Sequence, residues 1–453
     1  MATVQSTKGI FGQEQTHQEM TTSSLDLFGM PTFESIMRHG EDILINPQNS
    51  LSSSPYTFQI RTTDPTQFTY LPQSSMHGTV RISRADGTPI QEEDNVSIAN
   101  CLPLALFNQC ECYVNQTLVS DLSSNSYAYK SYNELMHSYS SQVKNKNLET
   151  LMYSYESPDE VHTQNTVGDA NVNSALRARK LKYLVGSKEV HFARPLFADF
   201  CMTEKFLPPE TTLDLRFHRQ SDSFCIIARD ERDYKIEILD LYLVTRRVTV
   251  SDVFARSFAN ARLKEALRFP FVLCGIRHYL LTRGTQTKIV PSISAGIKNL
   301  RQILVTFHDN SAFNGLKAAN PFVSSPNDIQ EIHLIKDGKP YYNLHRPLSF
   351  NKDKNVNGFV HGYLHHLRNL GIGYTDNEAM SLAEYSTNLF GYSIDFSPEL
   401  CNNWHSHKEQ NSSIDLSLTF AKPLPETIIV CVYLSRDVML QIQPDGRSEV
   451  IEC

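Results

Sequence analysis

The sequence lacks the features that mark membrane and nucleotide-binding proteins. None of its apolar runs reaches the roughly 18 residues that a membrane-spanning helix requires. The first residues also lack the apolar core of a secretory signal peptide. A P-loop, a GxSxG or GxGxxG motif and an EF-hand loop are missing from the 453 residues. We therefore expect a protein that is made and folded in solution, without membrane insertion and without these common ligand sites.

An excess of positive charge is missing as well. The formal net charge is −7, whereas extensive neutralisation of phosphates requires a basic surface. We therefore expect no strong direct binding of nucleic acid. Two basic clusters stand out, Arg177–Lys182 and the pair Arg246 and Arg247. The cluster Arg177–Lys182 has two interpretations, contact with a genome or inner protein, and ion pairing at a subunit edge. Ion pairing is at least as well supported as contact with a genome or inner protein.

Cysteine is present without the spacing of a disulfide framework or a zinc site. The nine cysteines are odd in number and scattered, and several lie inside apolar runs such as 429–432. Cys110 and Cys112 flank Glu111, but no second cysteine pair completes four ligands. We expect reduced, buried thiols of a cytoplasmic or nuclear protein. The positions are Cys101, Cys110, Cys112, Cys201, Cys225, Cys274, Cys401, Cys431 and Cys453.

Histidine supplies the one pattern that is compatible with a metal. His361 and His365 are spaced i, i+4, beside His366, but no acidic third ligand stands at a recognisable spacing. Both lie opposite the apolar stripe of their helix, which favours a solvated face or a subunit contact. His405 and His407, near Trp404, form a second group. We assign no catalytic, cofactor or metal residue, and we expect no enzyme activity.

Aromatic residues and short strand-like runs are abundant. The chain has 24 Phe and 20 Tyr, with 40% hydrophobic and 20% charged residues, a globular composition that favours β structure. Its length predicts two cores rather than one. The runs are bounded by turn residues, which is typical of antiparallel β sandwiches. They are 56–61, 78–83, 111–114, 212–217, 235–244, 300–307, 331–335, 392–396, 414–420 and 427–434.

Three helices interrupt the strand pattern. Helical spacing of apolar residues begins near Asn125 or Ser126 and includes Tyr129 and Tyr132. A second helix is predicted for 251–268, with Ser251 as its N-cap and Pro270 marking its end. A third covers 359–367, with Gly371 as its C′ glycine. Residues 1–24 show neither helical nor strand periodicity and predict a flexible arm.

A weak internal repeat suggests two similar domains in tandem. Leu207–Phe217 resembles Leu424–Tyr433, because in both a proline turn leads into a strand. Tyr113–Val119 resembles Leu334–Pro340, and Val80–Ile82 resembles Ile303–Val305; the three separations are 217 to 223 positions. The repeat predicts that 212–217 and 427–433 occupy the same place in two sandwiches. Leu213, Leu215 and Phe217 should then be buried together, as should one alternating set from 428–434.

Several segments, in order, carry a family resemblance from about residue 25 to residue 447. They are Ser24–Phe28 with Pro31, Asn46–Pro47, Asn100–Phe107, Val114–Asn115, Ser126–Leu135, Asn320–Phe322, Gly391–Pro398 and Leu416–Leu424. The chain resembles the major capsid proteins of Polinton (Maverick) elements and adintoviruses. One departure is that Asn115-Gln116 is followed by Thr and Leu, where a glycine turn is more typical.

The resemblance implies an all-β double jelly roll of two tandem eight-stranded antiparallel rolls with short helices in the connections. It implies hexon-like, pseudo-hexagonal homotrimers in an icosahedral virion capsid, made in the host cytoplasm and assembled there or in the nucleus. Penton and other minor capsid proteins would be the partners. The expected organisation is an arm (1–24), a first roll with its lead-in (25–250), a linking helix (251–268), a second roll (269–443) and a tail (444–453).

Two alternatives remain open. A penton-like minor capsid protein usually needs one jelly roll, which the repeat argues against. A carbohydrate-binding or carbohydrate-active β sandwich shares the strand pattern, but the enzyme would need a pair of carboxylates that nothing in the sequence marks out.

Overall fold

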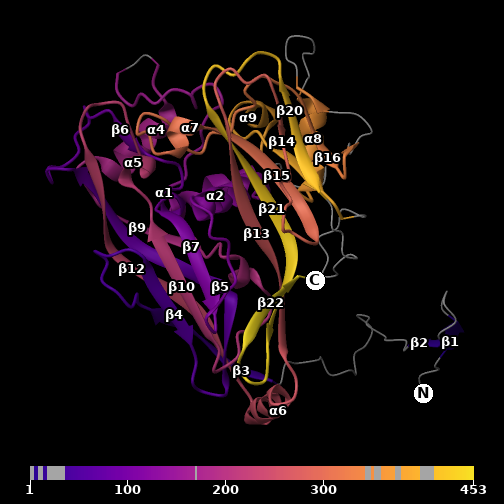
Figure 1. Ribbon diagram of the computed structural model, residues 1–453. Helices are drawn as coiled ribbons and strands as arrows, with labels where there is room; N and C mark the ends of the chain where they lie inside the picture. Colours follow the sequence, from indigo (N-terminus) through magenta and orange to yellow (C-terminus); the bar gives the residue numbers. More distant parts are fainter. Residues whose placement is uncertain are drawn as a thin grey trace.

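The computed structural model describes residues 36–168, 171–341, 348–350, 359–372, 379–397 and 413–452, and the backbone of two short paired strands, β1 (Gln5–Lys8) and β2 (Glu14–His17). The rest of the predicted arm lies outside these residues. So do Cys401, Trp404, His405, His407 and Cys453. The described chain folds into two antiparallel β sandwiches that stand side by side (Figure 1).

The first sandwich consists of two four-stranded sheets, ordered β3-β12-β5-β9 and β4-β10-β7-β8. Successive strands pass from one sheet to the other, except at the β7–β8 hairpin, which is the connectivity of a jelly roll. The strands are β3 (Met37–Ile45), β4 (Tyr56–Arg61), β5 (Gln67–Arg84), β7 (Phe107–Val114), β8 (Thr117–Leu118), β9 (Glu189–Pro195), β10 (Thr212–Arg219) and β12 (Tyr234–Val250). A separate small ladder joins β6 (Val96–Ile98) to β11 (Ile226–Ala228).

The second sandwich repeats this order, with sheets β13-β21-β15-β19 and β14-β20-β16-β17. Its strands are β13 (Leu267–Leu281), β14 (Thr287–Val290), β15 (Leu300–Asp309), β16 (Ile329–Lys336), β17 (Lys339–Tyr341), β19 (Tyr392–Asp395), β20 (Ile414–Phe420) and β21 (Ile428–Ile442). Two further strands extend it: β18 (Leu348–Ser349) pairs with β16, and β22 (Ser448–Glu452), inside the predicted tail, pairs with β21. The predicted double jelly roll is confirmed.

The sheet order tests the three repeated segments. Val80–Ile82 in β5 and Ile303–Val305 in β15 occupy the same position, and the β7–β8 and β16–β17 hairpins also correspond. The prediction that 212–217 and 427–433 occupy the same place is wrong. The strand β10 corresponds to β20, whereas 427–433 forms the first part of β21, which is the counterpart of β12. Both are central strands that follow a proline turn. Alternation along a strand reports which face is buried, and it does not report the strand's place in the sheet.

The burial of these two strands also differs. Leu213, Leu215 and Phe217 are buried together in β10, as predicted. In β21 the whole run 428–434 is buried, rather than one alternating set, because the helix 126–138 of the first roll covers its second face, where the Asn133 amide donates to the Tyr433 hydroxyl at 2.6 Å. A strand covered on both faces loses its alternation.

The β7–β8 hairpin closes without the typical glycine. Its two loop residues, Asn115 and Gln116, have φ values of 45° and 70°. The matching β16–β17 loop uses Asp337 and Gly338, with φ values of 51° and 75°. Two consecutive residues with positive φ make the turn type whose twist suits a two-residue hairpin. Gln116 thus adopts a backbone conformation that L side chains disfavour.

We expect Gln116→Gly to stabilise the protein by about 0.5–1 kcal/mol, because glycine adopts this conformation without a steric penalty. Gly338→Ala, in the equivalent turn, should destabilise it by about 1 kcal/mol. Urea midpoints of both variants measure the effect. A lower midpoint for Gln116→Gly would show that the side chain contributes more than the turn strain costs.

Helices occupy the connections between strands. The long ones are α2 (Ser126–Ser138), α6 (Asp252–Arg262) and α8 (Val360–Asn369). The short ones are α1 (Leu102–Ala105), α3 (Ser141–Asn147), α4 (Ser174–Arg179), α5 (Asp222–Cys225), α7 (Asn310–Phe313), α9 (Leu382–Thr387), the 3-10 turns η1 (Leu148–Leu151) and η3 (Asp199–Met202), and the π turn η2 (Lys180–Leu184). Within the described residues, none has the length and apolar character to cross a membrane.

The helix boundaries correct one prediction. Ser251 caps α6 as expected, its hydroxyl accepting from the Phe254 amide at 3.4 Å. The helix ends at Arg262 rather than at 268, and Pro270 lies inside β13. Proline is tolerated there because β13 is an edge strand. Gly371, with φ 76°, follows α8 as the predicted glycine.

Candidate functional site

The contact zone between the two jelly rolls, here called the seam, is the most elaborate site of the described chain. Helix α2 belongs to the first roll and lies against the second (Figure 1). Tyr132 stacks on Phe322 with ring centroids 4.2 Å apart, and Tyr129 stacks on Phe313 at 5.3 Å. The Tyr129 hydroxyl donates to the Pro321 carbonyl at 2.8 Å. These aromatic contacts bury apolar surface from both rolls at once.

Side chains of the first roll also cap the edge strand β13 of the second. The Cys274 amide donates to Asp199 Oδ2 at 3.1 Å, and the Ile276 amide donates to Asp121 Oδ2 at 3.3 Å. The Ser123 hydroxyl donates to the Ile276 carbonyl at 2.7 Å. An open edge strand is a template for pairing with other chains. Here part of that edge is satisfied inside the molecule, which holds the two rolls in one orientation.

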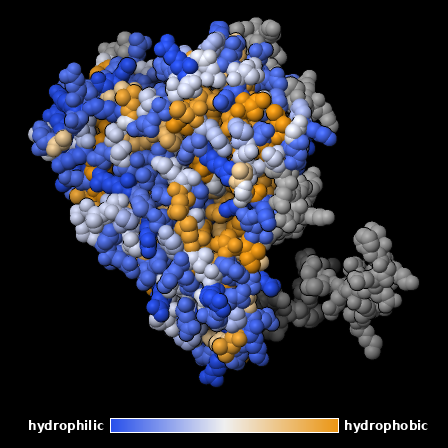
Figure 2. Space-filling model, in the orientation of Figure 1, coloured by the Kyte–Doolittle hydropathy of each residue, from blue (hydrophilic) through white to orange (hydrophobic). Residues whose placement is uncertain are grey.

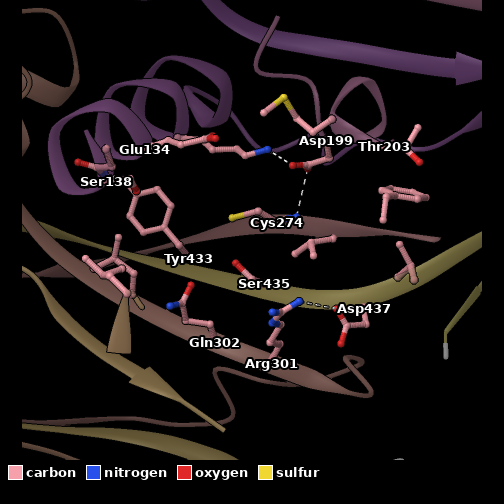
Figure 3. Close-up of a pocket in the computed structure, with 18 of the residues that line it drawn as sticks. Glu134, Ser138, Asp199, Thr203, Cys274, Arg301, Gln302, Tyr433, Ser435 and Asp437 are labelled. Atoms are coloured by element: carbon pink, nitrogen blue, oxygen red, sulfur yellow. Dashed lines mark hydrogen bonds and ion pairs between the residues drawn. The ribbon is translucent and has the colours of Figure 1, made fainter. Parts of the chain in front are cut away.

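A groove of about 500 Å³ follows the seam between α2, η3, β13, β15 and β21 (Figure 3). Lys130 forms an ion pair with Asp199 across one end, and Arg301 pairs with Asp437 at 3.3 Å on the opposite wall. Glu134 lies on the α2 wall, where burial raises the pKa of its carboxyl. Burial also raises the pKa of the Cys274 thiol, so this cysteine is not an activated nucleophile. These ion pairs and the unactivated thiol indicate that the groove is a contact zone between two packed domains.

A buried histidine chain crosses the seam. His137 Nδ1 lies 2.8 Å from His366 Nε2, and His366 Nδ1 lies 3.0 Å from the Ser393 hydroxyl. That hydroxyl donates to the His366 carbonyl, so His366 Nδ1 donates to Ser393 and His366 Nε2 accepts from His137. Burial lowers the pKa of His137 to about 3 and the pKa values of His308 and His365 to about 4. All are therefore neutral at physiological pH.

We expect the free energy of unfolding to fall as the pH drops from 7 to 4. The unfolded histidines, with pKa near 6.5, bind protons in this range while the folded ones do not, so acid favours the unfolded state. Each histidine contributes up to about 1.4 kcal/mol per pH unit. Urea midpoints at several pH values measure the slope. His137→Gln should reduce it and His361→Gln, at an exposed position, should not; a flat profile from pH 7 to 5 would contradict the prediction.

The helix α8 corrects the predicted solvated face. His361 is exposed, but His365 is buried, stacked on Tyr392 at 6.2 Å and hydrogen bonded to Asn369. The helical pattern alone does not show that β19 covers this side of the helix. Among the described residues, no group of three or more His, Cys, Asp or Glu side chains is placed to hold a metal ion.

The predicted thiols are unpaired, and six of the seven described are buried. Burial raises the pKa of both Cys110 and Cys112, which lie in β7.

The two basic clusters are used inside the fold. In the cluster Arg177–Lys182, Arg179 is fully buried and pairs with Glu156 at 2.6 Å, while Lys182 pairs with Glu149. The second cluster is also used internally, since Arg246 pairs with Asp42 at 3.0 Å and the Arg247 guanidinium donates to the Arg61 carbonyl.

The sequence contains no signal for the seam. The residues that cap β13 are 75 to 155 positions away from their partners. They are single polar residues in connections, and isolated Asp and Ser residues are common in any loop. Only the folding of the chain brings these polar residues to the edge of β13.

No protein-family model matches the chain. A chain in the cryo-EM structure of the Sputnik virophage is similar with a TM-score of 0.62 at 10% identity, over 98% of this chain and 94% of that one. The Faustovirus major capsid protein has a TM-score of 0.57 at 9% identity, over 91% and 92%. A quasi-atomic structure of the PBCV-1 virus capsid has 0.56 at 10%, over 94% and 99%.

Among curated proteins, an uncharacterized protein of Caenorhabditis elegans is 22% identical over 329 residues, which are 71% of this chain and 73% of that protein. At such identities the structural likeness establishes the fold and not the activity. The chain has the double jelly-roll fold of viral major capsid proteins.

Proposed function

We propose that this chain is a structural major capsid protein that assembles as homotrimers into an icosahedral shell. The observation that carries the proposal is a pair of jelly rolls with the same strand order, held side by side by α2 and by the capped edge of β13. Three such chains around an axis present six similar rolls, which is the outline that a hexagonal lattice position requires. A rigid seam keeps these six edges in register.

The coverage of the structural neighbours supports the same role. The Sputnik chain and this chain align over more than nine-tenths of both lengths, so no large additional domain of either remains outside the comparison. The two rolls also argue against a penton-like protein, which usually has one. We assign the chain no catalytic activity. The groove along the seam is a contact zone between the two rolls, and four of its charged side chains form two ion pairs, Lys130 with Asp199 and Arg301 with Asp437.

We further propose a Polinton or adintovirus type of capsid protein. A relative encoded by a nematode is in keeping with a coat protein carried by a genomic element. In this proposal 25–250 form the first roll with its lead-in, 267–452 form the second, 1–24 is an assembly arm, and penton and minor capsid proteins are partners in the virion. Synthesis would take place in the host cytoplasm.

The outer surface offers contacts for assembly. Figure 2 shows apolar side chains over the second roll and along the middle of the same face. Exposed apolar residues include Leu280 on β13 and Ile289 on β14, at 56% and 51% exposure. Stable interfaces combine an apolar centre with a polar rim.

Native mass spectrometry of the full chain at micromolar concentration tests the proposal. We expect a species of three times 51.5 kDa, and a hexagonal outline by negative-stain electron microscopy. A pentamer would indicate a penton role. Monomer alone across the concentration series would contradict the proposal.

A further inference from the structure

A second groove, of about 320 Å³, lies where α6 connects the two rolls. Its lining is mainly apolar and includes five phenylalanines, of which Phe68 and Phe258 make an edge contact at 5.2 Å. Phe68, Val250 and Ala255 form a small buried cluster that is separate from the main core, with Phe206 and Phe258 partly buried against it. The volume falls within the roughly 300–1,000 Å³ of typical binding pockets. The groove therefore has room for large apolar side chains.

The charged residues of this groove are of one sign. Lys205 and Arg268 line it, both are exposed, and no acidic residue lines it. Within the described part of the chain, neither forms an ion pair. Val253 on α6 and Leu263, directly after it, are 76% and 75% exposed, and Figure 2 shows apolar surface at this tip of the molecule. An apolar groove with two unpaired cations favours an acidic, apolar partner.

Residues 25–35 of this chain, which lie outside the described residues, have that composition. The segment Leu-Asp-Leu-Phe-Gly-Met-Pro-Thr-Phe-Glu-Ser contains five large apolar residues, two acids and no cation. It joins the fold at Ile36, whose side chain lines the groove and whose carbonyl accepts from the Ser251 amide at 2.8 Å. The attachment point of the segment is thus the rim of the groove itself.

We propose that residues 25–35 bind in the α6 groove of their own chain, with apolar side chains among the phenylalanines and Asp26 and Glu34 facing Lys205 and Arg268. An extended chain spans about 3.3 Å per residue, so the segment has ample reach. A tethered segment also has an effective concentration in the millimolar range, which favours it over a second copy. Binding in this place would fasten α6 to both rolls and would not depend on shell assembly.

Photo-crosslinking of the full chain tests this inference. With p-benzoylphenylalanine in place of Phe206, we expect a crosslinked product of monomer mass whose crosslinked peptide contains residues 25–35. A product of dimer mass would assign the groove to a second copy and overturn the proposal. Crosslinks to other segments only, or none, would also overturn it.

Charge reversal tests the chemistry of the match. Lys205→Glu with Arg268→Glu should reduce the crosslink yield about tenfold, since two attractive contacts become repulsive. Asp26→Lys with Glu34→Lys in the same chain should restore it. Lys188→Glu, at an exposed position outside the groove, should leave the yield unchanged, and circular dichroism confirms that each variant is folded. An unchanged yield in the Lys205 and Arg268 variant, or a failure to restore it, would contradict the proposal.

Discussion

Leu215→Asp is expected to unfold the first jelly roll. Leu215 is fully buried in β10, the strand between β4 and β7, where Phe58 and Cys112 are its cross-strand neighbours. A carboxylate at this position has no partner, and the burial of an unpaired charge costs several kcal/mol. This loss is comparable with the roughly 5–15 kcal/mol that stabilises a typical protein. The urea midpoint by circular dichroism measures it, and we expect little folded protein even without urea.

Thr57→Asp is the matched control. Thr57 lies on the outer face of β4, directly opposite Arg216 in the sheet. The new carboxylate therefore meets solvent and a cation, and the free energy of unfolding should change by no more than about 0.5 kcal/mol. Equal losses in both variants would show that the two faces of this sheet are not buried as described.

Arg179→Ala is expected to cost about 3–5 kcal/mol, the range for breaking a buried ion pair. Arg179 is fully buried, its Nη2 lies 2.6 Å from Glu156 Oε1, and its Nε donates to the Ile98 carbonyl at 3.1 Å. Glu156 also accepts from Asn320 of the second roll at 3.3 Å. Removing the guanidinium leaves a buried carboxylate without its cation, next to the seam.

Two further variants interpret that result. Arg177→Ala removes an exposed neighbour that donates to the Gly168 carbonyl at 3.3 Å, and it should cost less than about 0.5 kcal/mol. Replacing both partners, with Arg179→Met and Glu156→Leu, should recover most of the lost stability because no charge remains unpaired. Urea midpoints compare all three. A loss below about 1 kcal/mol for Arg179→Ala would mean that solvent reaches the pair.

The sequence by itself determined the local elements. The alternation of apolar and polar residues in 212–217 predicted which side chains of β10 are buried, because successive side chains of a strand point to opposite faces of the sheet. Capping and helix-ending residues placed the N-cap of α6 at Ser251 and the end of α8 before Gly371. The order of turn-bounded runs, with the family resemblance, predicted two tandem jelly rolls. Two of the three repeated segments proved to be equivalent.

Only the tertiary structure decided which elements meet. The proline-led strand after Leu424 belongs to β21 and not to the counterpart of β10, because neighbours in a sheet are chosen by packing over the whole fold. His365 is buried by a strand that its own helix pattern does not contain. Arg179 is buried in an ion pair with Glu156, which lies 23 positions away along the chain. A local pattern records how one face of an element differs from the other, and burial depends on what the rest of the chain places against that face.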